Sequence, residues 1–439
     1  MSKVSVPYLG KGQRPRVLML TTQLGYGGSE ADFLRLARYL SLQLPVTIAL
    51  FSRDYGSTDY SSNDSGTDLP MVLLDDKRVT SRSLPTLTLR WWRMLRRLRA
   101  LKRQHDVTIS FLSGPNLLNA LAGWRFASIV SERGSKLHHR GIPPRTKALW
   151  AGVLDPLIYR LVDRIVPASN DYAAEIAKIA GGGQAWKIVP IEGGINAKAL
   201  IARTEAPVEE EIAAFCAAPT VVFCGRLDLG KGIDFLLPVF AKVKQNLPEA
   251  RLLVIGDGPL LNALLASAQA AGLTVTQGAD SAADVYFAGY RSDPMRYFRH
   301  CRVFAFPSQH EGLPNALIEA VASGIPLLAA DCNFGPRSIL ADSEERVRPI
   351  NPHDLPLELT YGTLMPMVDV PGSAEIWERH LVAALSRQHQ RGTPERCAAA
   401  VARFDIEATG PRWVELICAL TLPTTNAKAP NILEDGPST

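Results

Sequence analysis

The sequence predicts an α/β protein built from two doubly wound, Rossmann-like domains that face each other across a cleft. Short runs of β-branched residues alternate with segments of helix-forming composition, first from Arg16 to Glu192 and again from Thr220. This alternation is typical of parallel sheets covered by helices. The chain has 439 residues, of which 46% are hydrophobic, so it is long and apolar enough to form two packed cores.

The first domain is expected over residues 16–200, after a flexible N-terminus over residues 1–15. Its candidate strands are VLMLT, VTIAL, MVLLD, VTISFL, SIVSE, RIVPAS and KIVPI. The second domain is expected over residues 220–402, with the candidate strands TVVFCG, RLLVIGDG, VYFAGY, VFAFPS and IPLLAA. Residues 201–219, rich in Ala and Glu, are the expected linker between the domains. A disordered tail is expected over residues 423–439.

Composition excludes several classes of protein. The chain has 48 basic and 43 acidic residues, and this net charge of +5 is too mild to indicate a nucleic-acid partner. The six cysteines show no CxxC spacing, so we expect neither a zinc site nor a disulfide framework, and a reducing cytoplasm is favoured. The apolar runs are all too short for a membrane span, and no export signal is predicted. The oligomeric state is left open.

Two loops carry groups suited to phosphate, and both follow candidate strands. In open parallel sheets, ligands bind beyond the carboxyl ends of the strands. Gly27 and Gly28 follow the first candidate strand and open a helix, where unpaired amide groups favour a phosphate. Arg226 and Lys231 follow the strand TVVFCG, and both could neutralise a diphosphate. A plain strand-to-helix turn and a pair of solvated cations would also explain these loops.

The segment Phe306–Ala320 is the most informative one. Pro314 suits the first turn of a helix, so the amides near Asn315 and Ala316 would face an anionic ligand. Glu311 lies in the loop before this helix, whereas Glu319 lies inside it. A carboxylate in this position can accept hydrogen bonds from a pair of sugar hydroxyls. Two glutamates eight positions apart are common by chance, so the spacing alone decides little.

Taken together, in this order and at these separations, the segments resemble the retaining family-4 glycosyltransferases of the GT-B architecture. The resemblance runs from about Val17 to Leu420. It rests on GGSE, GRLDLGKG, VIGDGP, FAGY, the segment with two glutamates, and the closing RFDIE…W helix. A closer resemblance, to the bacterial subgroup that assembles lipid-linked oligosaccharides or exopolysaccharides, rests on Glu311–Asn315, Asp331–Arg337 and Tyr361–Pro366. Residues 403–422 would then form a helix that returns to the first domain.

The resemblance implies a donor site in which cations hold the diphosphate of a nucleotide sugar. Catalysis would depend on Arg226, Lys231 and Glu311, with Glu311 against the donor sugar and Glu319 on the ribose. The full set of matching donor-binding residues is Gly27, Gly28, Arg226, Lys231, Glu311, Leu313, Asn315, Ala316 and Glu319.

The resemblance also implies the reaction and its partners. The anomeric configuration of the sugar would be retained, and neither a metal nor another cofactor would be needed. A UDP-sugar is the favoured donor, with GDP-mannose as the other candidate. The acceptor would be a saccharide, in this subgroup a lipid-linked one. The enzyme would then be cytoplasmic and peripheral, at the inner face of the cytoplasmic membrane.

The chain departs from the pattern of the subgroup at three places. Ser338 follows Gly335-Pro336-Arg337, where the subgroup usually has a glutamate on the donor side. The first-domain histidine that some relatives place near the sugar is not evident between Ser110 and Gly123. The loop Gly193–Asn196 is only a loose version of the usual asparagine-containing segment between the domains. At position 338, either the choice of donor differs or the glutamate is not essential.

Weaker candidates lie elsewhere in the first domain. Glu132 and Arg133 follow a strand, and His138 and His139 come shortly after, so these four could meet the acceptor. Taken alone, the two histidines are better explained as exposed loop groups. Asp75-Asp76 resembles half of a metal-binding DxD motif but lacks its spacing, so we expect no metal site.

Two other functions fit the same architecture. A nucleotide-sugar epimerase would change the donor sugar without any acceptor. A scaffold that binds without transferring is disfavoured because both cations and both glutamates are present.

A basic segment predicts a contact with an anionic membrane surface. In the helix expected over Leu87–Arg103, the apolar residues lie on one side, as a core-facing stripe should. The stretch 90–103 contains seven cations and no acid. Trp92 falls on the far face beside Arg96 and Arg99, an arrangement suited to lipid headgroups. A basic helix that only faces water would show the same pattern.

Overall fold

The computed structural model describes residues 14–25, 27–51, 68–75, 84–123, 125–278, 282–347, 350–387 and 391–421. The first domain contains a parallel six-stranded sheet with the strand order β3-β2-β1-β4-β5-β6. Its strands are β1 (Val17–Thr21), β2 (Val46–Leu50), β3 (Met71–Leu73), β4 (Val107–Phe111), β5 (Ala127–Glu132) and β6 (Arg164–Pro167). They coincide with the first six runs expected from the sequence.

The seventh expected strand of this domain, KIVPI, was a wrong prediction. The segment lies beside β6 without forming a strand: it makes one bridge, between Ile188 and Ile165, and the amides of Val189 and Ile191 donate to the carbonyls of Ile165 and Pro167 at 2.9 and 3.3 Å. Pro190 lies between these two bonded residues and has no amide hydrogen, so the side of the segment away from β6 lacks a donor there for a further strand. The segment instead leads out of the sheet toward the second domain.

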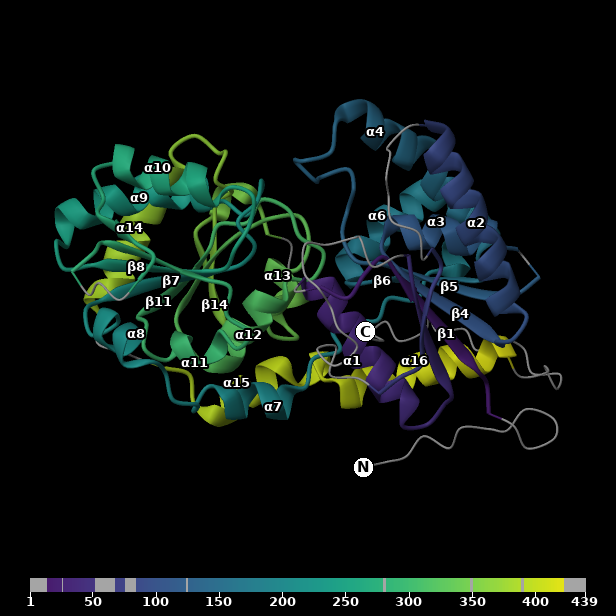
Figure 1. Ribbon diagram of the computed structural model, residues 1–439. Coiled ribbons are helices and arrows are strands. Elements are labelled where there is room, and N and C mark those ends of the chain that lie inside the picture. The colour runs from purple at the N-terminus through teal and green to yellow at the C-terminus, as the bar shows by residue number, and fades with distance from the viewer. Residues whose placement is uncertain are drawn as a thin grey trace.

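Helices cover both faces of the first sheet, as Figure 1 shows. They are α1 (Gly28–Ser41), α2 (Leu84–Lys102), α3 (Ser113–Leu121), α4 (Pro144–Leu149), α5 (Asp155–Leu161) and α6 (Asn170–Ala180), with a π-helical turn η1 (Trp150–Leu154) joining α4 to α5. Strand residues such as Met19, Ile48 and Ile109 are fully buried beneath them. This burial on both faces explains why the strands read as continuous apolar runs.

The second domain contains an eight-stranded sheet with the order β13-β14-β12-β11-β7-β8-β10-β9. Its strands are β7 (Thr220–Cys224), β8 (Arg251–Ile255), β9 (Val275–Thr276), β10 (Val285–Gly289), β11 (Val303–Phe306), β12 (Leu327–Ala330), β13 (Leu357–Leu359) and β14 (Gly362–Met365). All pairs are parallel except β13 with β14. This terminal hairpin was not foreseen from the sequence.

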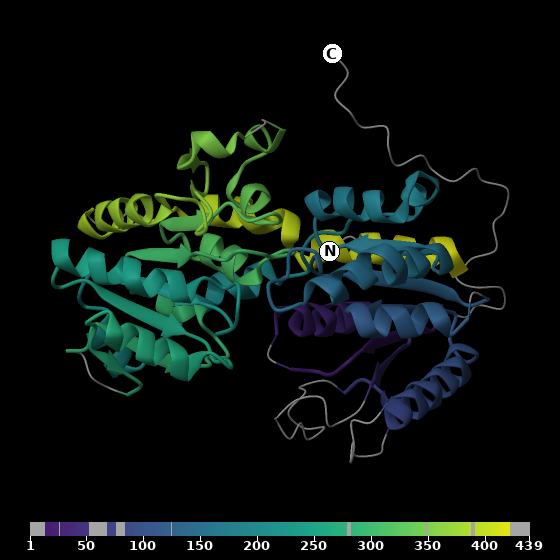
Figure 2. The same ribbon diagram turned by 90° about the horizontal axis from the view of Figure 1, so that it is seen from above.

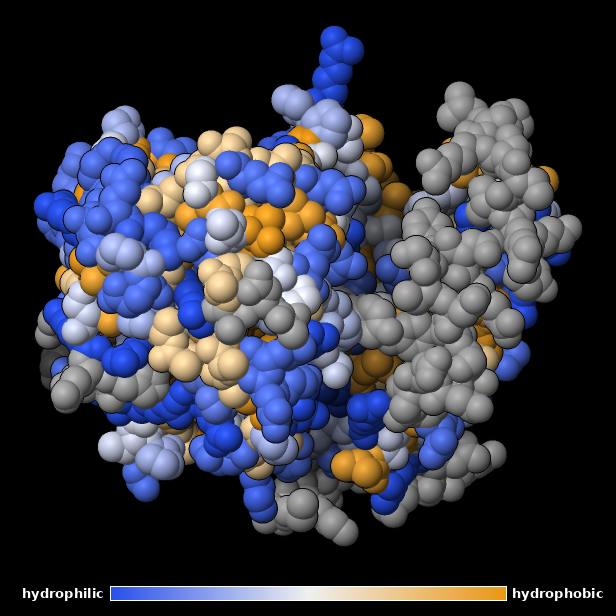
Figure 3. Space-filling view, turned by 60° about the vertical axis from the view of Figure 1, so that its left-hand side comes forward, coloured by the Kyte–Doolittle hydropathy of each residue, from blue (hydrophilic) through white to orange (hydrophobic). Residues whose placement is uncertain are grey.

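Helices also cover the second sheet. They are α9 (Ile233–Asn246), α10 (Leu261–Ala270), α11 (Met295–Phe298), α12 (Asn315–Ser323), α13 (Pro336–Leu340), α14 (Ser373–Ser386) and α15 (Pro394–Val401). Trp377 of α14 is fully buried against the sheet, and its indole donates to the Pro366 carbonyl at 3.0 Å. On the face in Figure 3, hydrophilic side chains predominate and hydrophobic ones gather in patches. The polar surface and apolar interior fit a domain with its own core.

The segment expected as a linker is folded. Residues 201–219 carry the end of α7 (Ala197–Arg203) and all of α8 (Glu210–Phe215). Leu200, Ile212 and Phe215 are buried in the same cluster as strands of the second sheet. The connection therefore packs as part of the second domain.

The chain crosses between the domains twice, and the two crossings run side by side. The amides of Gly194 and Ile195 both donate to the Phe404 carbonyl, at 2.8 and 3.0 Å. Gly193 has a φ of +88°, and a Cβ there would collide with the backbone of Phe404, so only glycine fits. After this crossing, α16 (Ile406–Thr421) lies along the first domain (Figure 2). Its Trp413 stacks on Phe111, with 6.2 Å between the ring centroids.

Some expected features fall outside the described residues. These are positions 1–13 of the N-terminal segment and the expected tail at 423–439. Within the described part of the chain, none of the helices has the length and apolar character that crossing a bilayer requires.

Candidate active site

The carboxyl ends of the two sheets face each other, and loops from both domains meet there. Asn315 begins α12 of the second domain, and its Nδ2 donates to the Gly28 carbonyl of the first domain at 3.2 Å. A Cβ at Gly312 would collide with the carbonyl of Arg133. At the rim, Arg140 pairs with Asp369 at 2.8 Å. The loops that carry the predicted donor residues therefore meet between the two domains, and this region is called the cleft below.

Lys231 and Glu311 form an ion pair at the floor of the cleft. The Nζ of Lys231 lies 2.7 Å from the Oε1 of Glu311. Burial alone would lower the pKa of Lys231, but the adjacent Glu311 carboxylate outweighs burial, and the pKa is raised. Lys231 is therefore a permanent cation in a half-buried position. Gly230 and Gly232, at φ of +93° and +73°, allow the tight turn that presents it.

Arg226 is the exposed cation of the same loop. Its side chain is 70% exposed, and its Nε lies 3.4 Å from the Oδ2 of Asp228. Burial raises the pKa of Glu30 in the first domain, and the charge of Arg226 opposes that rise. Arg226 therefore faces the start of α1, next to Gly27 and Gly28. A ligand between these segments would meet an exposed guanidinium from one side and helix amides from the other.

Glu319 lies one turn inside α12, half-buried. Burial raises its pKa to about 7, and the charge of Arg35 from the first domain partly opposes this. Among the described residues, none donates a hydrogen bond to its carboxylate. The group is thus positioned to accept hydroxyl hydrogen bonds from a ligand. Two further residues were predicted for the donor site. Leu313 is buried in the core, and Ala316 is half-buried on α12.

Asp32 is a cleft residue that the sequence did not reveal. It is buried on α1, where it pairs with Arg35 of the same helix and with Arg133 after β5. It also accepts from Asn315 Nδ2 at 2.9 Å. Burial alone would raise the pKa of Asp32, but the two arginines lower it, so the carboxylate is ionised. The only sequence signal was the spacing of Asp32 and Arg35, which permits a pair on one helix face.

Two predicted acceptor residues are not free to bind an acceptor. The Arg133 side chain is buried and paired with Asp32. Glu132 is also buried, and its carboxylate accepts from Asn116 Nδ2 and Lys136 Nζ, both at 3.1 Å. Successive side chains of a strand point to opposite faces, so neighbours in sequence need not share a site. This buried ion network stabilises the loop after β5.

The two predicted histidines do line the cleft. His138 bonds to Glu175 at 2.9 Å and lines a cavity of about 420 Å³ between α6 and Phe334 of the second domain. His139 lies against His310, with 4.6 Å between their ring centroids. Burial lowers the pKa of His310 to about 4, and His139 adds to this effect. These groups therefore lie where the first and second domains meet.

The departure at Ser338 has a local explanation. The hydroxyl of Ser338 donates to the Gly335 carbonyl at 3.1 Å. The preceding Arg337 binds both oxygens of Asp331 at 2.5 Å. The loop is therefore held by its own contacts, without a carboxylate at position 338.

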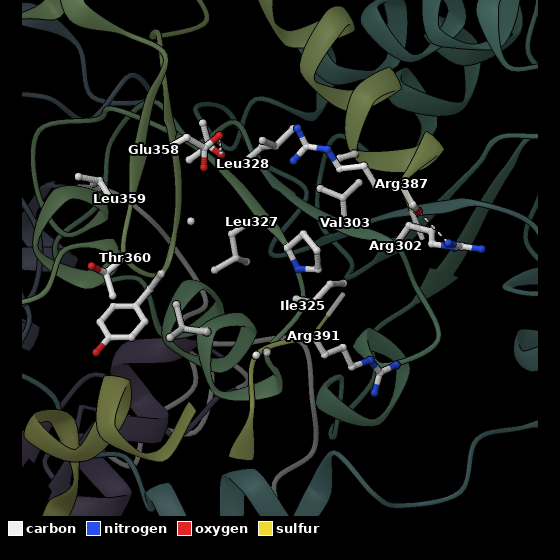
Figure 4. A pocket seen from close by; sticks show the side chains of 18 of the residues that line it. Arg302, Val303, Ile325, Leu327, Leu328, Glu358, Leu359, Thr360, Arg387 and Arg391 are labelled. Atoms are coloured by element: carbon white, nitrogen blue, oxygen red, sulfur yellow. Dashed lines mark hydrogen bonds between the residues drawn. The ribbon is translucent and has the colours of Figure 1, made fainter. Parts of the chain in front are cut away.

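A second cavity, of about 380 Å³, lies away from the cleft (Figure 4). It borders Val303 and Leu327, where strands of the second sheet begin rather than end. In Figure 4, the guanidinium groups of Arg302 and Arg391 point away from Leu327 instead of converging on one point. The cavity therefore lacks the arrangement of an active site.

The basic helix α2 has fewer available charges than its sequence suggests. Trp92 is 52% exposed, and the Arg96 guanidinium lies 4.6 Å from its ring centroid. The side chain of Arg99, however, donates to the carbonyls of Leu121 and Ala122. Lys102 is buried, and burial lowers its pKa to about 7.

The half-motif Asp75-Asp76 does not form a metal site around Asp75. Asp75 is buried and pairs with Arg90 at 2.8 Å, while Asp76 lies outside the described residues. Within the described part of the chain, no group of three His, Cys, Asp or Glu side chains is arranged to hold a metal.

Comparison with known proteins supports a family. Residues 218–361 match the family described as glycosyl transferases group 1. An uncharacterised glycosyltransferase of Methanocaldococcus jannaschii is 37% identical over 116 residues, which cover 26% of this chain and 27% of that protein. The N-acetylgalactosamine-N,N'-diacetylbacillosaminyl-diphospho-undecaprenol 4-alpha-N-acetylgalactosaminyltransferase of Campylobacter jejuni is 32% identical over 124 residues, 28% of this chain and 31% of that protein. The chain thus matches less than a third of the length of either relative.

The fold is GT-B, as the sequence predicted. The crystal structure of HepE from Anabaena, in complex with UDP and glucose, matches with a TM-score of 0.69 at 16% identity. The match covers 92% of this chain and 100% of that one. The family match favours a transferase over the epimerase considered from the sequence.

Proposed function

We propose that this protein is a glycosyltransferase that moves a sugar from a nucleotide-sugar donor to a saccharide acceptor. The observation that carries the proposal is the convergence of Arg226, Lys231 and Glu311 at the cleft, with Glu319 behind them on α12. All four lie inside the segment that matches the group 1 glycosyltransferases. Two cations beside two carboxylates are the groups that a sugar diphosphate requires: positive charge for the phosphates and acceptors for the hydroxyls.

The donor would lie between α12 and the start of α1. The amides at Gly27 and Gly28 would bind the distal phosphate, and Glu319 would bind the ribose hydroxyls. Arg226 would close over the diphosphate, since it is exposed and faces α1. Lys231 would hold the same diphosphate, while Glu311 contacts the sugar. A UDP-sugar is the favoured donor, and GDP-mannose is the other candidate.

The reaction is proposed to retain the anomeric configuration. The bond from the anomeric carbon to the phosphate oxygen breaks while the acceptor oxygen attacks from the same face. The acceptor proton passes to the leaving phosphate. Negative charge grows on that phosphate as the bond breaks, and Arg226 with Lys231 would stabilise it. This arrangement leads us to propose that catalysis requires neither a metal nor another cofactor.

The acceptor is proposed to be a lipid-linked saccharide of bacterial glycan or polysaccharide synthesis. The name of the Campylobacter relative describes transfer to a sugar on diphospho-undecaprenol. His138 and His139 lie on the open side of the cleft, where such an acceptor would enter. The enzyme would then work at the inner face of the cytoplasmic membrane. Trp92 and Arg96 of α2 are one proposed contact with the anionic surface, with Arg99 restricted by its bonds to carbonyls.

A two-step experiment tests the proposed function. A thermal-shift panel of UDP-, GDP- and ADP-sugars identifies the donor, because a ligand that binds only the folded state raises Tm. The best donor, labelled in its sugar, is then incubated with lipid-linked saccharides. Label in the lipid fraction with retained anomeric configuration is the expected result. Conversion of the donor sugar in the absence of acceptor would contradict transfer and indicate an epimerase.

A further inference from the structure

The helical segment 144–161, formed by α4, η1 and α5, carries an apolar stripe that faces solvent. Leu149, Val153 and Leu157 are spaced four residues apart and are 50%, 55% and 39% exposed. On the other side of the same segment, Ile158 and Tyr159 are fully buried against the domain. The outward side chains therefore lie on one line along the helix, with no described segment packed over them. Exposed apolar patches of this kind mark an interaction surface.

The charges around this stripe have one sign. Arg145, Lys147 and Arg160 belong to the same segment, and within the described residues none of the three makes an ion pair. The one acidic residue of the segment, Asp155, is buried and pairs with Lys136 at 2.9 Å. The exposed side of the segment therefore combines aliphatic side chains with cations and has no carboxylate.

The stripe lies next to the opening of the cleft. The chain that enters α4 passes through His138, His139 and Arg140. His138 lines the cleft cavity, His139 contacts His310, and Arg140 pairs with Asp369 of the second domain. Figure 1 shows α4 at the outer end of the first domain, on the side where the two domains face each other. A molecule bound along the stripe would therefore be held beside the acceptor side of the site.

We infer that the segment α4–η1–α5 binds an anionic membrane surface, with Leu149, Val153 and Leu157 in the headgroup region and the three cations against lipid phosphates. An apolar helix face flanked by basic residues is the arrangement of helices that lie in a membrane interface. Protein interfaces, by contrast, contain few lysines and many aromatic residues at their centre. This inference rests on the proposed function, because binding of the segment to the membrane would bring a lipid-linked acceptor to the cleft. Unlike α2, this face keeps its cations free of internal partners.

Vesicle flotation with the full chain tests the inference. The probe is a vesicle of phosphatidylcholine and phosphatidylglycerol at low salt. One variant replaces the stripe (Leu149→Ser, Val153→Ser, Leu157→Ser), and a second reverses the charges (Arg145→Glu, Lys147→Glu, Arg160→Glu). The matched control, Leu42→Ser with Val370→Ser, removes two exposed apolar side chains elsewhere on the molecule. Thermal unfolding and UDP affinity are measured for every variant.

The wild type and the control are expected to float with anionic vesicles. Each of the two test variants should lose at least tenfold in partition coefficient while keeping its Tm and its UDP affinity. Failure of the wild type to float, or equal flotation of the stripe variant, would overturn the inference. So would a wild-type dimer in size-exclusion chromatography that the stripe variant converts to monomer, because the face would then bind a second copy. Since UDP affinity is measured separately, failure of the donor site would be distinguished from failure of this surface.

Discussion

The Nδ2 of Asn315 lies 2.9 Å from the Oδ1 of Asp32, although the two residues belong to different domains and are 283 positions apart. Asp32 is already paired with Arg35 and Arg133 inside the first domain. The contact therefore joins α12, which carries Glu319, to a carboxylate that is itself held in place. It ties the helix proposed to bind the donor to the first domain.

Asn315→Ala is expected to open the cleft without destabilising either domain. A hydrogen bond to a charged group contributes about 1.5–3 kcal/mol, so donor affinity should fall roughly tenfold or more. Small-angle scattering should give a larger radius of gyration, and calorimetry should give the affinity. Asn246→Ala, on α9 away from the cleft, is the control. An unchanged radius together with unchanged affinity would show that the contact does not hold the closed form.

Arg226→Ala and Lys231→Ala should each lower turnover at least a hundredfold, whereas EDTA should have little effect. Removing one preorganised electrostatic contact to a developing charge costs roughly 3 kcal/mol. The control is Lys242→Ala, which removes an exposed lysine of α9 that pairs with Glu375 of α14. This variant should leave turnover unchanged. Full activity of either test variant would exclude that residue from catalysis. Loss of activity in EDTA would contradict the metal-independent mechanism.

Glu319→Gln should weaken nucleotide binding, whereas Glu311→Gln should chiefly lower turnover with the sugar donor. The ribose contact is made equally in the ground and transition states, so its loss affects affinity. Glu311 is proposed to contact the sugar where charge develops near the anomeric carbon, so its loss should affect kcat. Calorimetry with UDP and initial rates with the donor separate the two effects. An unchanged UDP affinity in Glu319→Gln would remove Glu319 from the ribose.

Nucleotide affinity should depend on pH through Glu319. Its pKa is about 7 in the folded protein, and only the ionised carboxylate accepts two hydroxyl hydrogen bonds. Affinity should therefore rise between about pH 6 and 8, by up to roughly tenfold per unit below the pKa. UDP titrates in the same range, so the measured quantity is the difference between wild type and Glu319→Gln. Parallel profiles would contradict the assignment.

The same raised pKa affects folding. Because the pKa of Glu319 in the folded protein lies above the ordinary glutamate value of 4.5, ionisation of Glu319 opposes folding. The contribution of Glu319 to the free energy of unfolding is fully present below pH 4.5, where the carboxyl is protonated, and is lost as the pH rises to about 7. Thermal unfolding should therefore show Glu319→Gln gaining stability relative to wild type across this window.

Trp92→Ser with Arg96→Glu should reduce flotation with anionic vesicles at low salt. Each cation near such a surface contributes about 1 kcal/mol, and an exposed Trp suits the headgroup region. Arg99 is left unchanged because its side chain holds the end of α3. Leu42→Ser with Val370→Ser serves again as the control. Equal flotation of variant and wild type would exclude α2 as a membrane contact.

The sequence predicted most of the fold because the central strands are buried on both faces. Runs such as Val17–Thr21 and Val303–Phe306 are fully buried, and their apolar character is visible without a structure. The hairpin of β13 and β14 escaped notice because its strands have only three and four residues and are partly exposed. KIVPI has the composition of a strand but pairs with β6 only through one bridge and two hydrogen bonds, and composition cannot reveal how far such pairing extends.

The sequence predicted those site residues that directly follow a strand. It did not reveal the residues that belong to the site only because the two domains pack together. Lys231 and Glu311 lie in loops after β7 and β11, which are neighbours in the sheet, and they meet at 2.7 Å. Asp32, by contrast, becomes part of the cleft only because α12 lies against α1. Glu132 looked available, but the direction of its side chain depends on the buried Lys136 and Asn116. The charges of α2 were visible in the sequence, whereas their internal partners were not.

The position of α16 determines when the first domain can finish folding during synthesis. Trp413, Val414 and Ile417 are buried in the same cluster as Val17 and Phe33, near the other end of the chain. Domains usually fold in order as the chain leaves the ribosome. Here the cluster beneath α1 stays incomplete until residue 417 has emerged, after the whole second domain has been made. Of the two domains, the one that is translated earlier is therefore completed later. A chain truncated at residue 402 would leave Phe111 without the Trp413 that covers it.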